Sequence, residues 1–379
     1  MTPKSKTLRE FAEMAKALGN SATRSWKEQE RRVMGYLCSA VPEEIFTAAG
    51  FLPFRIRATG STGTELSDSY FSNLNCSFVR HCFNVALLGE YDFLDGVVLI
   101  NSCDNVRRIY DHWTRQLKTP FVRIMSFPRK TGRPQVDWYH KELTELRTGM
   151  EEHFGLEISD DRLWESIRLH NETRRLQRQL YELRKAEDPP ISGADTLAVV
   201  VAGTAMPKET YNDMLRDLLA ELRDTEGIVD HRARLMVLGS ILDDPEYVRV
   251  IESQGGLVVT DSTCFGSRIL WKDVREEGDD PIQALARYYV ADRHSCPRTF
   301  GEHERRAEFI RQMIREFHVD GVIGERLTFC DPWGFAQYSI KNDFEEDGIP
   351  YLSLEREYIL SGVGQLRTRV QAFLETLGG

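Results

Sequence analysis

Two stretches of this chain end in the same pair of residues, a cysteine followed by an aspartate. The first is Asp95–Asp104, DGVVLINSCD, and the second is Asp320–Trp333, DGVIGERLTFCDPW. Each begins with Asp-Gly and runs through a short apolar segment that is typical of a β-strand. In open parallel sheets, ligands collect at the carboxyl ends of the strands, where the chain turns into the next helix. We therefore expect Cys103 and Cys330 to converge on one ligand that lies between two domains.

A third cysteine, Cys76, has a chemically similar setting. It stands at the start of NCSFVRHCFNVALLGE, which follows the polar loop 60–69 and predicts a helix. Free backbone N–H groups and the helix dipole would favour the thiolate form at such a position. Thiolates are the usual ligands of iron–sulfur clusters, and three of them on a four-iron cluster leave one iron able to take an exogenous group. The same residues also allow a plainer interpretation, that all three are ordinary buried cysteines.

The other cysteines are Cys38, Cys82, Cys264 and Cys296, which makes seven in all. An odd number in a chain that we interpret as cytoplasmic argues against a disulfide framework and leaves metal binding, catalysis or burial. No CxxC pair is present, so a closed zinc site is not favoured. Cys38 lies in apolar company before a predicted helix, and we interpret it as a buried structural residue.

Composition excludes several classes of protein. The 379 residues favour two domains, and 41% apolar with 28% charged residues is typical of a globular chain. A net charge of −10 argues against a general nucleic-acid binder. No apolar run approaches the ~18–20 residues that span a bilayer, and the N-terminus lacks the apolar region of a signal peptide. We therefore predict a cytoplasmic protein with no nucleic-acid or membrane partner.

Helices and strands alternate along the first half. Two long helices, Asp137–Phe154 and Asp160–Lys185, follow this alternation, and EDPPISGAD then marks a boundary. We predict an N-terminal domain over residues 1–190 and a C-terminal domain over 191–379. The earlier elements that we expect are a helical N-terminus to about Glu30, a helix from Pro42 to Gly50, strands at Phe51–Ile56, Val97–Ile100 and Phe121–Met125, and a helix at Asp104–Leu117.

The second half repeats the pattern. Pro245-Glu246 to Gly255 parallels Pro42-Glu43 to Gly50, and the two Asp-Gly stretches correspond in the same way. The expected elements are a buried strand TLAVVVAG at 196–203, helix Pro207–Arg223, strand Arg234–Leu238, a helix ending at Gly255, a strand ending on Cys264, and a final helix from about Glu355 to Leu377. We predict an α/β protein with two facing flavodoxin-like or Rossmann-like domains, parallel sheets, and N-terminal and connecting helices.

Several stretches in series resemble the family of 2-hydroxyacyl-CoA dehydratase and benzoyl-CoA reductase subunits. They are GYLCSAVPEEIFTAAGFLP, NCSFVRHC, LDGVVLINSCDNVRRIYDHW, VVTDSTCFGSR and FCDPWGFAQYSIKNDFEEDGIPYLSLE, in the family's order over nearly the whole chain. The size resembles the smaller core subunit of a class I, ATP-dependent benzoyl-CoA reductase.

This resemblance implies a site and a set of partners. Carried over by position, Cys76, Cys103 and Cys330 would hold a [4Fe-4S] cluster at the junction of the two domains. The partners implied are a homologous larger core subunit, an ATP-hydrolysing iron–sulfur activator, ferredoxin as upstream donor, and an acyl-CoA substrate. No GxxxxGK[ST] phosphate loop is present, so ATP would be used by a partner and not by this chain.

The resemblance leaves the reaction open. In the reductases, electrons of very low potential reduce the ring of benzoyl-CoA to a cyclic diene, a step of anaerobic aromatic degradation. In the dehydratases, one recycled electron makes a ketyl radical that expels a hydroxyl group. Cys82, Cys264 and Cys296 could add three thiolates and give the double-cubane [8Fe-9S] cluster of some relatives. An interpretation from another class is a non-catalytic scaffold or electron-relay subunit.

Residues near the cysteines suggest further roles, although none is assigned as catalytic. Four aromatic residues could form a dry shell around a cluster or be ordinary core residues: Phe78, Phe329, Trp333 and Phe335. His81 and His294 adjoin cysteines and are possible proton donors. Arg268 and Arg298 could meet the phosphates of coenzyme A.

Overall fold

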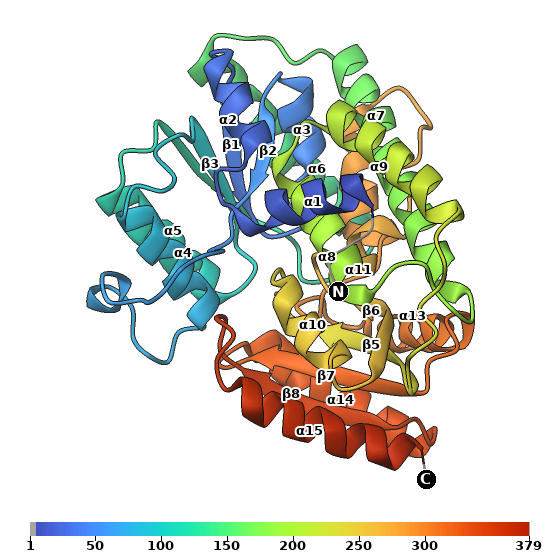
Figure 1. Cartoon of the computed structure of the whole chain (residues 1–379). Helices are drawn as coiled ribbons and strands as arrows, with labels where there is room; N and C mark the ends of the chain where they lie inside the picture. The colour runs from blue at the N-terminus through green and yellow to red at the C-terminus, as the bar shows by residue number, and fades with distance from the viewer. Residues whose placement is uncertain (1–4, 379) are drawn as a thin grey trace.

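Two four-stranded parallel sheets organise the molecule (Figure 1). The computed structural model describes residues 5–378, and in it every paired strand runs parallel to its neighbour. The first sheet has the order β2-β1-β3-β4, from β1 (Val33–Leu37), β2 (Leu52–Arg55), β3 (Gly96–Ile100) and β4 (Phe121–Met125). The second has the order β6-β5-β7-β8, from β5 (Ala233–Gly239), β6 (Gly256–Ser262), β7 (Gly321–Leu327) and β8 (Tyr351–Arg356).

The two sheets share one strand order, 2-1-3-4, which is the flavodoxin-like order. β1 corresponds to β5 and β3 to β7, so the internal repeat inferred from the two Asp-Gly stretches is a structural repeat. The order reverses between β1 and β3 and again between β5 and β7. Ligands bind at such switch points, outside the carboxyl ends of the strands. The predicted fold class, two facing flavodoxin-like α/β units, is confirmed.

Helices cover both faces of each sheet. On the first sheet, α4 and α5 bury one face and α3 and α6 the other, and α7 packs against α3. On the second, α8 and α10 lie on one face and α13 and α14 on the other. The helices are α1 (Lys6–Lys16), α2 (Ser21–Glu28), α3 (Glu43–Ala48), α4 (Ser77–Leu87), α5 (Asp104–Gln116), α6 (Arg133–Phe154), α7 (Asp160–Glu182), α8 (Gly193–Ala202), α9 (Lys208–Arg223), α10 (Pro245–Glu252), α11 (Ser267–Leu270), α12 (Pro281–Arg287), α13 (His303–Glu316), α14 (Asp331–Glu346) and α15 (Val363–Leu377).

Two helices pack on the side of the molecule that is built around the sheet of the other half of the chain. α1, at the N-terminus, lies against α8 (Figure 1), and α12 lies against α6. The chain therefore crosses between the two sheets more than once. The division at residue 190 stays a prediction.

The predicted strand TLAVVVAG is wrong, because these residues form most of helix α8. Every residue of α8 except Asp195 is buried, so the helix shows no polar face whose period would reveal it. Its start does carry a capping signal: the Ser192 side chain accepts from the Asp195 backbone N–H.

Two further elements differ from expectation. The predicted final helix begins too early, since residues up to Arg356 form edge strand β8 and the helix starts only at Val363. Strand β1 was not predicted at all, although all five of its residues are buried. Within residues 5–378, no helix is long and apolar enough to cross a membrane.

A cysteine-lined candidate site between the two sheets

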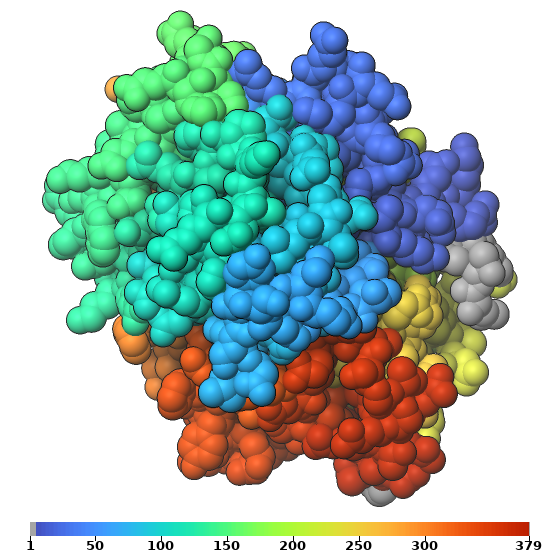
Figure 2. All heavy atoms as spheres, turned by 90° about the vertical axis from the view of Figure 1, so that its left-hand side faces the viewer, coloured from blue at the N-terminus to red at the C-terminus, as the bar shows by residue number. Residues whose placement is uncertain are grey.

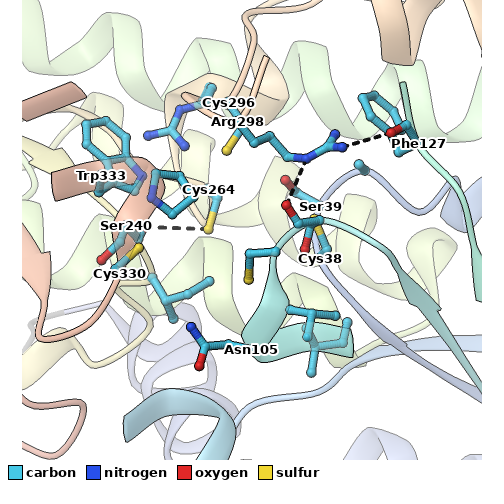
Figure 3. Close-up of a pocket in the computed structure, with 18 of the residues that line it drawn as sticks. Cys38, Ser39, Asn105, Phe127, Ser240, Cys264, Cys296, Arg298, Cys330 and Trp333 are labelled. Atoms are coloured by element: carbon cyan, nitrogen blue, oxygen red, sulfur yellow. Dashed lines mark hydrogen bonds between the residues drawn. The ribbon is translucent and has the colours of Figure 1, made fainter. Parts of the chain in front are cut away.

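One cavity of about 130 Å³ lies where the carboxyl ends of both sheets meet (Figure 3). Its wall includes the residues that follow β1, β3, β5 and β7, among them Ser102 and Ser240. Six of the seven cysteines line it: Cys38, Cys76, Cys103, Cys264, Cys296 and Cys330. The three cysteines that the resemblance singled out are thus brought to one place, from segments far apart in the sequence.

Cys76, Cys103 and Cys330 share one local geometry. Each is the N-cap residue of a helix, of α4, α5 and α14 in turn, and none of the three side chains caps its own helix by a hydrogen bond. The three helices therefore begin at the cavity with N–H groups that these side chains leave uncapped. Helix N-termini carry partial positive charge, so this arrangement favours an anionic group.

Burial keeps these thiols protonated in the metal-free protein. It raises the pKa of Cys76 to about 12, although the backbone N–H groups of Phe78 and Val79 act in the opposite direction. Burial also raises the pKa of Cys103 and of Cys330, and neighbouring cysteines add to both shifts. The helix terminus favours the thiolate of Cys76, as expected, but loss of solvent outweighs it in the metal-free chain. A metal would have to displace the protons.

Cys38, Cys264 and Cys296 form a second trio on the same cavity. Burial raises the pKa of Cys264, Arg55 and Arg268 lower it, and Cys38 and Cys296 raise it further. Arg55 donates to both the carbonyl and the sulfur of Cys264, at 2.6 and 3.3 Å. Cys38 has a φ of 91°, a left-handed conformation that is unusual for a non-glycine residue.

Cys82 does not belong to this trio. It is fully buried in the core beneath the first sheet and does not line the cavity, so naming it as a possible ligand was wrong. Cys38, which we interpreted as a buried structural residue, is only partly buried and lines the cavity. Cys38 directly follows β1, much as Cys103 follows β3, and prediction of β1 would have revealed it.

Four arginines line the cavity, and among residues 5–378 no aspartate or glutamate does. They are Arg55, Arg268, Arg293 and Arg298. Arg298 donates to the carbonyls of Ser102 and Phe127 (Figure 3), and Arg268 donates to those of Gly239 and Ser262. Both are buried in the cavity wall, and their contact with coenzyme A phosphates stays a prediction. The surplus of guanidinium groups fits an anionic occupant.

The four aromatic residues named for a dry shell fall into two pairs. Phe78 and Trp333 are buried and line the cavity, whereas the side chains of Phe329 and Phe335 are 39% and 81% exposed. His81 and His294 do not line the cavity. His81 forms a hydrogen bond with Ser61. His294 stacks on Phe309, and burial lowers the pKa of His294 to about 3. Neither histidine is placed to donate a proton inside the cavity.

The donor set determines which metal group fits. Across the part of the chain that the structure describes, no three His, Cys, Asp or Glu side chains approach closely enough to hold a single metal ion. A sulfide-bridged cluster spreads its thiolate ligands farther apart than one ion does. Thiols, three helix N-termini and buried guanidinium groups together fit an anionic iron–sulfur cluster.

Comparison with known proteins identifies the family of the chain. The family model for "2-hydroxyglutaryl-CoA dehydratase, D-component" matches residues 38–377. The chain belongs to this family. It is 29% identical to a subunit of the benzoyl-CoA reductase of Thauera aromatica over 366 residues, 94% of each chain.

Other members of the dehydratase D-component family are similar over the same span. A provisionally named dehydratase subunit of Escherichia coli is 31% identical, with 97% of each chain covered. The β subunit of (R)-2-hydroxyglutaryl-CoA dehydratase from Acidaminococcus fermentans is 24% identical, over 93% of this chain and 94% of that subunit. These relatives are subunits of larger enzymes, so the chain is an enzyme subunit of a hetero-oligomer. Identity at this level does not separate reductase from dehydratase.

Proposed function

We propose that this chain is a catalytic-core subunit of an ATP-dependent, ferredoxin-fed benzoyl-CoA reductase, with a [4Fe-4S] cluster on Cys76, Cys103 and Cys330. The observation that supports it most directly is the convergence of three cysteine N-caps, from α4, α5 and α14, on one buried cavity. The likeness to a benzoyl-CoA reductase subunit over 94% of the chain supports the choice of substrate.

The residues of the chain have defined roles in this proposal. The cluster, when bound, would supply single electrons of low potential to the aromatic ring. The three thiols hold it, the helix N-termini offset its negative charge, and Phe78 and Trp333 keep water away from it. ATP would be hydrolysed by the iron–sulfur activator, and the homologous larger subunit would complete the acyl-CoA site.

A first experiment tests both cluster and reaction. The chain is co-purified without oxygen with its sister subunit, and iron, acid-labile sulfide and the EPR spectrum are measured. We expect about four iron and four sulfide per chain, and loss of both in Cys103→Ala. Turnover of benzoyl-CoA with activator, ATP and reduced ferredoxin should give a cyclic diene. If the complex assembles and turns over normally with Cys103→Ala, the chain is a scaffold and the proposal fails.

The same assay distinguishes a 2-hydroxyacyl-CoA dehydratase. A dehydratase would release water from a 2-hydroxyacyl-CoA with no net consumption of electrons, and it would leave benzoyl-CoA unchanged. Product analysis with both substrates, under one set of electron-donor conditions, decides between these two reactions.

A specific observation favours a second candidate, a double-cubane reductase of small molecules. The trio of Cys38, Cys264 and Cys296 lines the same cavity as the first trio, and four arginines could balance the charge of six thiolates. This candidate predicts about eight irons per chain, and a loss of about half of them in Cys38→Ala. The benzoyl-CoA reductase proposal predicts that Cys38→Ala keeps the wild-type iron content.

A further inference from the structure

The side chain of Asn105 connects all three segments that carry the N-cap cysteines. Its Oδ1 accepts from the backbone N–H of Cys76 at 3.0 Å and from the side chain of Asn75 at 2.9 Å. Its Nδ2 donates to the backbone carbonyl of Phe329, the residue before Cys330, at 3.4 Å. Asn105 itself lies in the first turn of α5, two residues after Cys103.

This connection crosses the molecule. Asn75, Cys76 and Asn105 belong to the segments around the first sheet, whereas Phe329 follows β7 of the second. Figure 2 shows the surfaces of the two halves, blue to cyan and orange to red, in contact along this side of the molecule. Asn105 is 9% exposed and lines the cavity, so its amide is held in a largely dry setting. Hydrogen bonds are strong and directional there.

The backbone at the far end of this connection is strained. Phe329 has a φ of 63°, in the left-handed region that a non-glycine residue rarely adopts. Its carbonyl accepts the Asn105 amide, and its phenyl ring is partly exposed, so burial of the ring does not account for the conformation. The turn places Cys330 at the start of α14 with its side chain at the cavity.

We propose that Asn105 is the positioning residue that sets the relative placement of Cys76, Cys103 and Cys330. One planar amide joins the N–H of the first, the helix of the second and the peptide before the third. The two ends of the amide group divide these contacts, since the oxygen fixes the Cys76 segment and the nitrogen fixes the Cys330 segment. The inference rests on the proposed function, because three thiols need fixed placement only if they share a ligand.

α4 offers a matched control for a buried asparagine. Asn84 is 5% exposed, and its Oδ1 accepts from the backbone N–H groups of Leu66 and Ser67, at 2.9 and 3.3 Å. It fixes a loop much as Asn105 fixes a helix start, but it does not line the cavity. Asn84→Ala therefore reports what the loss of a buried amide does to the fold alone.

The experiment compares Asn105→Ala, Asn105→Asp and Asn84→Ala, each co-purified anaerobically with the sister subunit. Iron, sulfide, EPR spectrum and midpoint potential are measured, together with the melting temperature. We expect Asn105→Ala to retain less than half of the wild-type iron, and Asn84→Ala to retain all of it despite a comparable fall in melting temperature. Asn105→Asp keeps the acceptor for Cys76 but loses the donor to Phe329. The cluster that remains in Asn105→Asp should have an altered EPR spectrum and a more negative midpoint potential, because a carboxylate lies beside the cluster in this variant.

Wild-type iron content, EPR spectrum and potential in both Asn105 variants would overturn the inference. So would equal iron loss in Asn105→Ala and Asn84→Ala, because the effect would then be one of general stability. An iron-free wild-type complex would overturn the proposed function and this inference together, whereas iron in the wild type with no response to Asn105 overturns the inference alone.

Discussion

At the scale of single residues, the site depends on thiols that the protein holds in their neutral form. Burial raises the pKa of Cys76, Cys103 and Cys330, so the metal-free cavity contains protonated sulfur beside four guanidinium groups, with no carboxylate among the described residues that line it. Metal binding converts thiols to thiolates and releases protons. The positive surroundings, unfavourable in the metal-free cavity, then become complementary to the ligand set.

The position of a cysteine, and not its burial, should decide whether its loss affects the proposed cluster. We predict that Cys330→Ala loses more than half of the iron, because a ligand at the N-cap of α14 is removed. Cys82→Ala should keep the wild-type iron content, although Cys82 is fully buried, since it lies outside the cavity. The substitution Cys82→Ala should lower only the free energy of unfolding, by about 1 kcal/mol, because it removes one small buried group.

Iron and sulfide analysis of both variants, with urea unfolding of each, measures the two effects separately. Iron loss in Cys82→Ala equal to that in Cys330→Ala would contradict the assignment of the ligands.

The sequence allowed us to name the first cysteine trio and two members of the second, Cys264 and Cys296, but not Cys38. Cys103 and Cys330 follow recognisable strands, and the topology of parallel sheets brings strand ends together. Cys38 follows β1, whose residues VMGYL alternate too little to stand out, so its position at a strand end was hidden. Asn105 could not be identified because its role depends on a contact with Phe329, 224 residues away.

At the scale of elements, a buried cluster of charges joins α3, α7 and α9. Glu43 of α3 pairs with Lys208 of α9 at 3.1 Å, and Glu44 pairs with Arg174 of α7. His170 of α7 lies 3.9 Å from Glu43 and bonds to Thr47 at 2.9 Å. These contacts fix α3, the helix that follows β1 and the Cys38 turn, against the long connecting helices.

This cluster should make the protein sensitive to acid. Burial lowers the pKa of His170 to about 4, so its protonation costs stability as the pH falls from about 6.5 to 4. Although burial opposes it, Lys208 and His170 lower the pKa of Glu43 to about 2, and the stability from its charged form is lost as the pH falls from about 4.5 to 2. Both effects lower the free energy of unfolding as the pH falls.

We predict that His170→Gln flattens the stability profile between pH 6.5 and 4 and reduces, without abolishing, the loss below pH 4.5, because Lys208 still lowers the pKa of Glu43. The difference should reach about 3 kcal/mol, because each pKa unit corresponds to about 1.4 kcal/mol. Urea unfolding of the metal-free protein at pH 7, 5.5 and 4.5 measures it. His318→Gln, at an exposed histidine, is the control. Parallel profiles for the wild type and His170→Gln would show that His170 does not carry the effect.

Prediction of elements succeeded where one face of an element is polar. The helices Arg133–Phe154 and Asp160–Glu182 carry charged residues along one side, and both were expected within four residues of their observed bounds. α8 failed because it is buried on all sides, so the apolar run 197–201 has neither a period of two nor one of 3.6. A helix that is buried on all sides has no periodic alternation of polar and apolar residues, and prediction of secondary structure depends on that alternation.

At the scale of the whole molecule, the cavity lies close to an exposed aromatic patch. This patch consists of Phe335 and Tyr338, which are 81% and 70% exposed in turn. Phe335 and Tyr338 lie on α14, the helix that begins at Cys330, and they border a shallow surface hollow. Large exposed aromatic groups on one surface are typical of protein interfaces. The related proteins are subunits of larger enzymes, so a covered surface is expected.

We predict that the aromatic patch contacts the sister core subunit of the proposed enzyme. Phe335→Ser with Tyr338→Ser should weaken that association by about 30-fold or more, since buried aromatic anchors contribute about 2 kcal/mol or more each. The stability of the isolated chain should change little, because substitution at exposed positions usually stays within about 0.5 kcal/mol.

Val229→Ser provides the control for this prediction. Val229 is 73% exposed but precedes β5, at the amino end of that strand, whereas α14 begins beyond the carboxyl end of β7. Because β5 and β7 are parallel, the two positions belong to opposite ends of the second sheet. Co-purification and sedimentation of the complex measure the association. If the double variant and Val229→Ser bind the sister subunit as tightly as the wild type, the patch is not the interface, and the cluster would have to be approached from another side.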